Sequence, residues 1–146
     1  MPEINLRVRD LKGYYKGSFG TVYAVDKVSF TAKSGEIIGL AGESGCGKST
    51  LLKLLTGIIE PPLSYEGGEV EVKGYRIWDM TEEDLRKKVL GKLISYVPQS
   101  SYDALNPILR IIDFIADLLK EKTGRKYSAE EIRDMFADHL TRLGLD

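Results

Sequence analysis

The hydrophobic pattern of the first hundred residues is mostly that of strands. Apolar residues alternate with polar ones over residues 3–9, which is the period of a half-buried strand, and a second extended segment is predicted over 21–32. The apolar run 37–41 is short and continuous, as in a strand that is buried on both faces, and residues 93–97 have the same character. A hairpin-like excursion is expected over 61–78, where a segment rich in proline and glycine is followed by alternating residues.

Helical patterns interrupt and follow these strands. The expected helices lie at 51–55, directly after Thr81, near 108–122 and near 129–143. Gly57 can end the first helix in a left-handed conformation, and Thr81 is a typical N-cap for the second. Ser128, with Glu131 three residues later, forms the capping box that opens the last helix. Strands and helices together indicate an α/β protein.

The segment Gly42–Thr50 satisfies the phosphate-loop pattern G-x-x-x-x-G-K-[ST] between a predicted buried strand and a helix, the setting that this motif requires. Its glycines allow backbone N–H groups to point inward and approach phosphate oxygens. Lys48 supplies a mobile positive charge for the β- and γ-phosphates, the Ser49 hydroxyl suits Mg²⁺, and Thr50 can donate to a more internal phosphate. The predicted nucleotide-binding residues of the loop are Gly42, Ser44, Gly45, Cys46, Gly47, Lys48, Ser49 and Thr50. The sequence therefore predicts binding of a nucleoside triphosphate, namely MgATP.

Composition restricts the remaining classes of function. The 146 residues suit one domain, and 21 basic against 22 acidic residues leave a net charge of −1. This balance offers no basic surface, so no nucleic-acid partner is expected. The single cysteine cannot form an internal disulfide, the N-terminus does not resemble a signal peptide, and charges interrupt the most apolar stretches. We expect a cytoplasmic protein that does not itself cross a bilayer.

Three segments carry a resemblance to a known family. They are Ala24–Phe30 (AVDKVSF), Ser34–Glu36 (SGE) and Gly39–Thr50 (GLAGESGCGKST). With them the chain resembles the ATP-binding subunits of ABC transporters, and Ala104–Pro107 (ALNP) makes it most similar to the oligopeptide, dipeptide or nickel importer ATPases. The resemblance, which covers nearly the whole chain, implies an α/β fold: a P-loop NTPase (ABC ATPase) core fragment with an N-terminal antiparallel β-subdomain. That part would occupy about residues 1–100, and about 101–146 would be the start of a helical subdomain.

The resemblance also implies site residues outside the loop. Gln99 matches the family's Q-loop glutamine, which reaches Mg²⁺ and orients the attacking water. Lys48 and Gln99 are thus the predicted catalytic residues, and Ser49 and Gln99 the predicted Mg²⁺ ligands. The family stacks an aromatic ring on adenine after the first strand; counting forward selects Tyr15, the preferred assignment, and counting backward selects Phe19. The alternative that these aromatics only cover the sheet edge stays open.

Several hydrolytic elements of the family do not occur within the 146 residues. A Leu-Ser-Gly-Gly signature, a strand that ends in Asp with a following catalytic Glu, and a switch histidine are absent, and the only histidine, His139, lies in the last predicted helix. We expect the N-terminal part of an importer's ATP-binding subunit, which binds MgATP without hydrolysing it. The implied partners are a second nucleotide-binding subunit and membrane permease subunits at the inner face of the cell membrane. A soluble ABC-type ATPase and a non-catalytic ATP-binding module are the alternatives, and the solute is not specified.

Overall fold

The computed structural model describes residues 3–99 and 106–145 of the chain. Its contacts divide into two units, Met1–Tyr96 and Val97–Asp146, each with its own packing. The first unit contains a four-stranded sheet with two α-helices, and the second contains two further helices. The phosphate loop and Tyr15 belong to the first unit.

The sheet consists of two long strands and two shorter ones, all antiparallel to their neighbours. β1 (Ile4–Gly17) and β2 (Gly20–Lys33) form a hairpin, and β1 also pairs with β3 (Leu63–Val72), which pairs with β4 (Tyr75–Arg76). The strand order is β2-β1-β3-β4. The strand predicted at 3–9 therefore continues to Gly17, because the segment rich in glycine and tyrosine pairs with strands on both sides.

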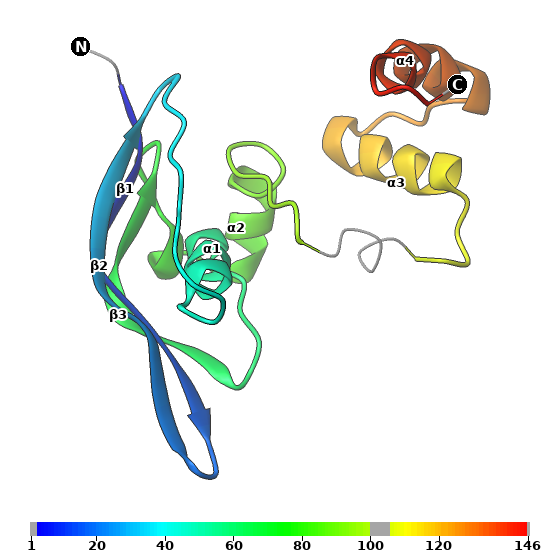
Figure 1. The fold of residues 1–146 in the computed structure, drawn as a ribbon. Coiled ribbons are helices and arrows are strands. Elements are labelled where there is room, and N and C mark those ends of the chain that lie inside the picture. The colour runs from blue at the N-terminus through cyan, green and yellow to red at the C-terminus, as the bar shows by residue number, and fades with distance from the viewer. Residues whose placement is uncertain (1–2, 100–105, 146) are drawn as a thin grey trace. The chain divides into compact units, whose positions relative to one another are not determined.

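One face of this sheet packs against helix α1 (Lys48–Thr56), as Figure 1 shows. Alternate residues of β1 and β3 bury apolar side chains there, and Leu54 of α1 is completely buried among them. The core of this unit consists of Val8, Leu11, Val25, Leu51, Leu54, Val70, Val72, Ile77, Leu85 and Val89. Gly57, in a left-handed conformation with φ 72°, ends α1 as predicted.

The opposite face of the sheet carries cross-strand ion pairs. Arg7 lies 3.7 Å from Glu71, and Arg9 lies 3.5 Å from Glu69. All four side chains are at least one-third exposed, and exposed pairs of this kind contribute only about 0–1 kcal/mol each. The buried apolar face, not these charges, therefore holds the sheet to α1.

After β4 the chain forms the short helix η1 (Ile77–Asp79) and then α2 (Glu82–Lys88). Thr81 is the N-cap of α2, as predicted, because its Oγ1 accepts a hydrogen bond from the Asp84 N–H at 3.2 Å. Leu85 and Val89 then bury their side chains in the same core as α1. The cap thus fixes the start of a helix that closes one side of the core.

The second unit pairs α3 (Ile111–Thr123) with α4 (Ala129–Arg142). The predicted capping box is confirmed: the Ser128 N–H donates to Glu131 Oε2 at 2.8 Å, and the Glu131 N–H donates to Ser128 Oγ at 3.2 Å. α3 begins later than predicted, because the Asn106 side chain accepts from the Ile108 N–H and holds a turn there. In the described part of the chain, no helix combines the length and apolar character that a membrane span requires.

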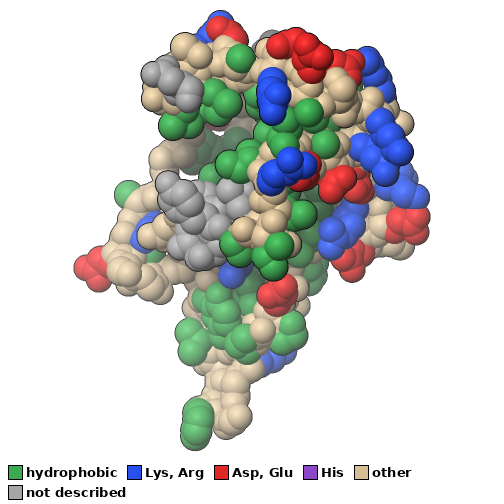
Figure 2. Space-filling view, turned by 90° about the vertical axis from the view of Figure 1, so that its right-hand side faces the viewer, with side chains coloured by type: hydrophobic (Ala, Val, Ile, Leu, Met, Phe, Trp, Pro, Cys, Tyr) green, Lys and Arg blue, Asp and Glu red, His purple; other side chains and the backbone are tan. Residues whose placement is uncertain are grey.

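Two predicted strands are wrong. Residues 37–41 and 93–97 form no strand, and the side chains of Ile37 and Val97 are 97% and 81% exposed. A strand needs hydrogen-bonded neighbours, and within residues 3–99 and 106–145 these runs have none apart from one isolated bridge at Ile94. Their apolar side chains are exposed, and Figure 2 shows that hydrophobic side chains are common on one face of the molecule.

Candidate nucleotide-binding site

The phosphate loop leads into the N-terminus of α1, which lacks a side-chain cap. The N-cap position is Gly47, in a left-handed conformation with φ 97°, and the first turn contains no acidic residue. α2 and α4, in contrast, begin with a side-chain cap and acidic residues. The first N–H groups of α1 are therefore left to other acceptors, and no carboxylate offsets the positive end of the helix. Such a helix start suits an anion such as phosphate.

The loop turns back on itself between Gly42 and Cys46. A Cβ atom at Gly42 would lie 2.7 Å from the Cys46 sulfur, so only glycine fits there without a shift of the cysteine. The Cys46 N–H also donates to the Glu43 carbonyl oxygen at 3.4 Å. Cys46 is exposed, and its side chain fills the inside of the turn rather than the apolar core.

Lys48 folds its side chain across the loop. Its Nζ donates to the carbonyl oxygens of Gly42 at 2.7 Å and Glu43 at 2.5 Å, and lies 3.4 Å from the Cys46 sulfur. A phosphate oxygen carries more negative charge than a carbonyl oxygen, and charge-assisted hydrogen bonds are the stronger kind. The ammonium group is thus held at the loop by acceptors that a phosphate can replace.

The two hydroxyl residues after Lys48 lie in different surroundings. Ser49 is exposed, as a residue that offers its hydroxyl to a metal ion must be. Thr50 is only 6% exposed, and its Oγ1 lies 3.1 Å from the Tyr15 hydroxyl. The first helical turn thus presents one hydroxyl to solvent and one to β1.

The two aromatic candidates occupy different places in the β1–β2 hairpin. Tyr15 lies in β1 opposite Val22 and Leu63, and its hydroxyl contacts the phosphate-loop helix through Thr50. Phe19 lies at the turn between β1 and β2, and its side chain is fully exposed. The structure brings Tyr15 to α1; the assignment of the adenine-stacking residue stays a prediction.

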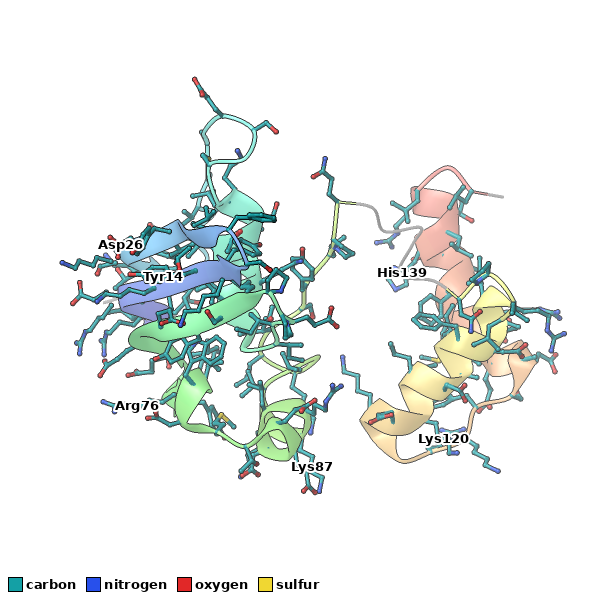
Figure 3. The ribbon with its side chains drawn as sticks, turned by 90° about the horizontal axis from the view of Figure 1, so that it is seen from below. Tyr14, Asp26, Arg76, Lys87, Lys120 and His139 are labelled. Atoms are coloured by element: carbon teal, nitrogen blue, oxygen red, sulfur yellow. The ribbon has the colours of Figure 1, made fainter. Side chains whose placement is uncertain are left out.

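Tyr14, next to Tyr15, makes a contact that the sequence did not reveal. Its hydroxyl donates to Asp26 Oδ1 at 2.9 Å, and the two side chains lie together on the sheet in Figure 3. The hydrogen bond to the Asp26 carboxylate raises the pKa of Tyr14 above 10.0, because the neutral phenol is the donor. Alternation along β1 sends neighbouring side chains to opposite faces, so only one of the two tyrosines reaches the loop. The adjacent tyrosines at positions 14 and 15 were the sequence feature that could have indicated this second contact.

The remaining predicted residues lie in the second unit or outside the residues that the structure describes. Gln99 is exposed, directly after Pro98, in a different unit from Ser49. Ala104 and Leu105 lie outside the described residues. His139 is exposed on α4, with its ring 6.2 Å from that of Phe136 in an edge-to-face arrangement, and is labelled in Figure 3. Within residues 3–99 and 106–145, no three His, Cys, Asp or Glu side chains gather where they could hold a metal ion.

Comparison with known proteins decides the family. The family described as "ABC transporter" matches residues 25–146, which includes the whole phosphate loop and most of the chain. The chain belongs to the ABC transporter family. This confirms the family resemblance inferred from the phosphate loop and its flanking segments.

Individual relatives of the chain are ATP-binding proteins of peptide transport. The dipeptide transport ATP-binding protein DppD of Caldanaerobacter subterraneus is 32% identical over 98% of this chain and 43% of the relative. The oligopeptide transport ATP-binding protein AppF of Bacillus subtilis is 37% identical over 98% of this chain and 44% of the relative. The dipeptide transport ATP-binding protein DppF of Haemophilus influenzae is 39% identical over 92% of this chain and 41% of the relative. The chain thus spans less than half the length of each of these three.

A solved structure confirms the fold class. The dimeric, post-hydrolysis state of the ATP-binding cassette MJ0796, bound to ADP and Pi, matches with a TM-score of 0.77 and 25% sequence identity. The match covers 97% of this chain and 58% of that one. The antiparallel sheet and helices of this chain are therefore part of an α/β P-loop ATPase fold, as predicted.

Proposed function

We propose that this ABC transporter family chain forms the ATP-binding part of a subunit that energises the import of peptides or a related small solute. The named relatives support the peptide class, since they are dipeptide and oligopeptide transport ATP-binding proteins. They also favour the importer over a soluble ABC-type ATPase or a non-catalytic ATP-binding module. The partners would be a second nucleotide-binding subunit and permease subunits, which would hold the protein at the cytoplasmic face of the membrane.

The observation that carries the proposal is the position of the Lys48 ammonium group at the uncapped start of α1. The phosphates of ATP would replace the carbonyl oxygens that Lys48 now contacts, and would accept from the first N–H groups of the helix. Ser49 and Gln99 would hold Mg²⁺, which offsets the phosphate charge when bound. Tyr15 would supply the ring against adenine.

Binding without turnover is the expected behaviour of these 146 residues. Phosphoryl transfer requires a positioned water and groups that stabilise the transferred charge. The sequence provides Lys48 and Gln99 but no catalytic Glu, signature segment or switch histidine. Residues of about 101–146 would begin the helical subdomain, through which an ATP-binding subunit contacts its permease.

A nucleotide titration tests the assignment of the binding site. We expect Lys48→Ala to weaken MgATP binding by roughly 10- to 100-fold, because hydrogen bonds to charged groups are worth about 1.5–3 kcal/mol. Lys53→Ala is the matched control, since Lys53 is exposed in the last turn of the same helix. Equal affinities of the wild type and Lys48→Ala would rule out the site. A phosphate-release assay in the same samples should detect no turnover; hydrolysis that Lys48→Ala abolishes would refute the claim of binding alone.

A further inference from the structure

The contact between Tyr15 and Thr50 joins the strand β1 to the phosphate-loop helix. Thr50 is the only polar residue within the described part of the chain that is buried as a whole, at 6% exposure, and its Oγ1 lies 3.1 Å from the Tyr15 hydroxyl. Buried hydroxyl groups are normally hydrogen-bonded, because an unpaired one costs about 1–3 kcal/mol. Tyr15 is the side chain that meets this requirement for Thr50.

The direction of this hydrogen bond matters for a phosphate ligand. Each hydroxyl has one hydrogen to donate and can also accept. A phosphate oxygen only accepts, so Thr50 can bind it only if its own hydrogen is not used toward Tyr15. Both hydrogen bonds can form together when the Tyr15 hydroxyl donates to Thr50 Oγ1 and the Thr50 hydroxyl donates to the phosphate.

We propose that Tyr15 is a positioning residue, whose hydroxyl orients the Thr50 hydroxyl to donate to a nucleotide phosphate. This inference rests on the proposed function and adds a role for the Tyr15 hydroxyl that is separate from any contact of its ring. A ring that stacks on a base acts equally well in phenylalanine, whereas the hydrogen bond to Thr50 needs the phenol. The ring of Tyr15 would therefore act on the base directly, and its hydroxyl would act on a phosphate through Thr50.

Tyr14 provides the matched control. It precedes Tyr15 on the same strand and is also half-buried, but its hydroxyl donates to Asp26 at 2.9 Å rather than to the phosphate-loop helix. Removal of either hydroxyl deletes one hydrogen bond from β1. Only removal of the Tyr15 hydroxyl changes the surroundings of Thr50.

The test uses the whole 146-residue chain and two ligands, MgATP and Mg-tripolyphosphate, which has the phosphates but no base. We expect Tyr15→Phe to weaken binding of both by the same factor, about three- to tenfold, and Tyr14→Phe to leave both unchanged. In a Thr50→Val background, Tyr15→Phe should cause no additional loss, because the group that it orients is gone. Thr50→Val alone must weaken tripolyphosphate binding at least as much as Tyr15→Phe does. The fluorescence of Trp78, the single tryptophan, reports whether each variant is folded.

Three results would overturn the inference while the proposed function stands. One is a Tyr15→Phe protein that binds tripolyphosphate as tightly as the wild type does. Another is a Thr50→Val protein that loses less tripolyphosphate affinity than Tyr15→Phe does. The third is a set of losses for Tyr15→Phe and Thr50→Val that simply add in the double variant. If the wild-type chain binds neither ligand, the proposed function fails together with the inference. Binding by the wild type therefore separates a failure of the inference alone from a failure of the proposed function.

Discussion

Gly47 of the phosphate loop lies directly against Ala24 of β2. A Cβ atom on Gly47 would come within 2.3 Å of the Ala24 carbonyl oxygen, and Gly47 also has a positive φ of 97°. Backbone atoms cannot move aside as the end of a flexible side chain can. The position of the loop is therefore set by its contact with the β1–β2 hairpin, and not only by its own sequence.

Gly47→Ala should damage both the fold and the site. We expect the free energy of unfolding to fall by about 2–5 kcal/mol, the sum of left-handed strain and overpacking, and MgATP affinity to fall at least tenfold. Gly45→Ala is the comparison for stability, because Gly45 has a φ of 81° but no heavy atom within 4 Å of the added Cβ. It should cost only the backbone part, about 1–2 kcal/mol. Urea unfolding followed by Trp78 fluorescence measures the free energy of unfolding of both variants. Equal losses would show that the contact with Ala24 does not contribute to the destabilisation.

A second close contact joins the sheet to the loop-bearing helix. A Cβ at Gly13 of β1 would lie 2.3 Å from Leu54 Cδ1, and both residues are completely or nearly completely buried. Gly13→Ala should destabilise the chain by about 1–3 kcal/mol, and Leu54→Ala by about 2–5 kcal/mol. In the double variant the new methyl group partly fills the cavity, so its loss should be smaller than the sum of the single losses. Additive losses in the urea unfolding of the three variants would contradict this packing.

Local signals predicted the elements that local chemistry determines. Thr81 and the pair Ser128–Glu131 cap their helices as expected, because a side chain and a backbone N–H three residues away suffice to make such a cap. The phosphate loop was also recognisable, since its glycines and Lys48 follow a fixed spacing. These features require no knowledge of distant parts of the chain.

Features that depend on distant partners could not be predicted in the same way. The run at 37–41 has the composition of a buried strand but no hydrogen-bonded neighbour among the described residues. The extension of β1 to Gly17 depends on its pairing with β2 and β3, and the contact of Tyr15 with Thr50 spans 35 positions. Periodicity reports how a segment can be buried, whereas its actual neighbours are set by the tertiary structure.

The ion pair between Lys16 and Glu66 gives the sheet a pH dependence. Their charged groups lie 2.6 Å apart, and the hydrogen bond from Lys16 holds the pKa of the Glu66 carboxyl below 4.5. A carboxyl with a lowered pKa in the folded state stabilises the fold above its unfolded pKa, near 4.5, and this contribution disappears as the pH falls through the folded pKa. An NMR titration of the carboxyl carbons should give Glu66 a low pKa that returns toward 4.5 in Lys16→Met. An unchanged value in that variant would exclude the ion pair as the cause.

The exposed apolar run at 37–41 should make the isolated chain associate. The side chains of Ile37, Ile38 and Leu40 are 97%, 47% and 48% exposed, and contiguous apolar surface of this kind drives contact between molecules. We expect the wild-type chain to form dimers or larger species whose fraction rises with concentration, and Ile37→Lys to shift the distribution toward monomer. Ser34→Lys adds the same charge at a nearby exposed position without removing apolar surface, so it should have the smaller effect. Sedimentation velocity over a range of concentrations measures the distribution; a monomeric wild type, or an equal shift by both lysines, would count against a role for this run.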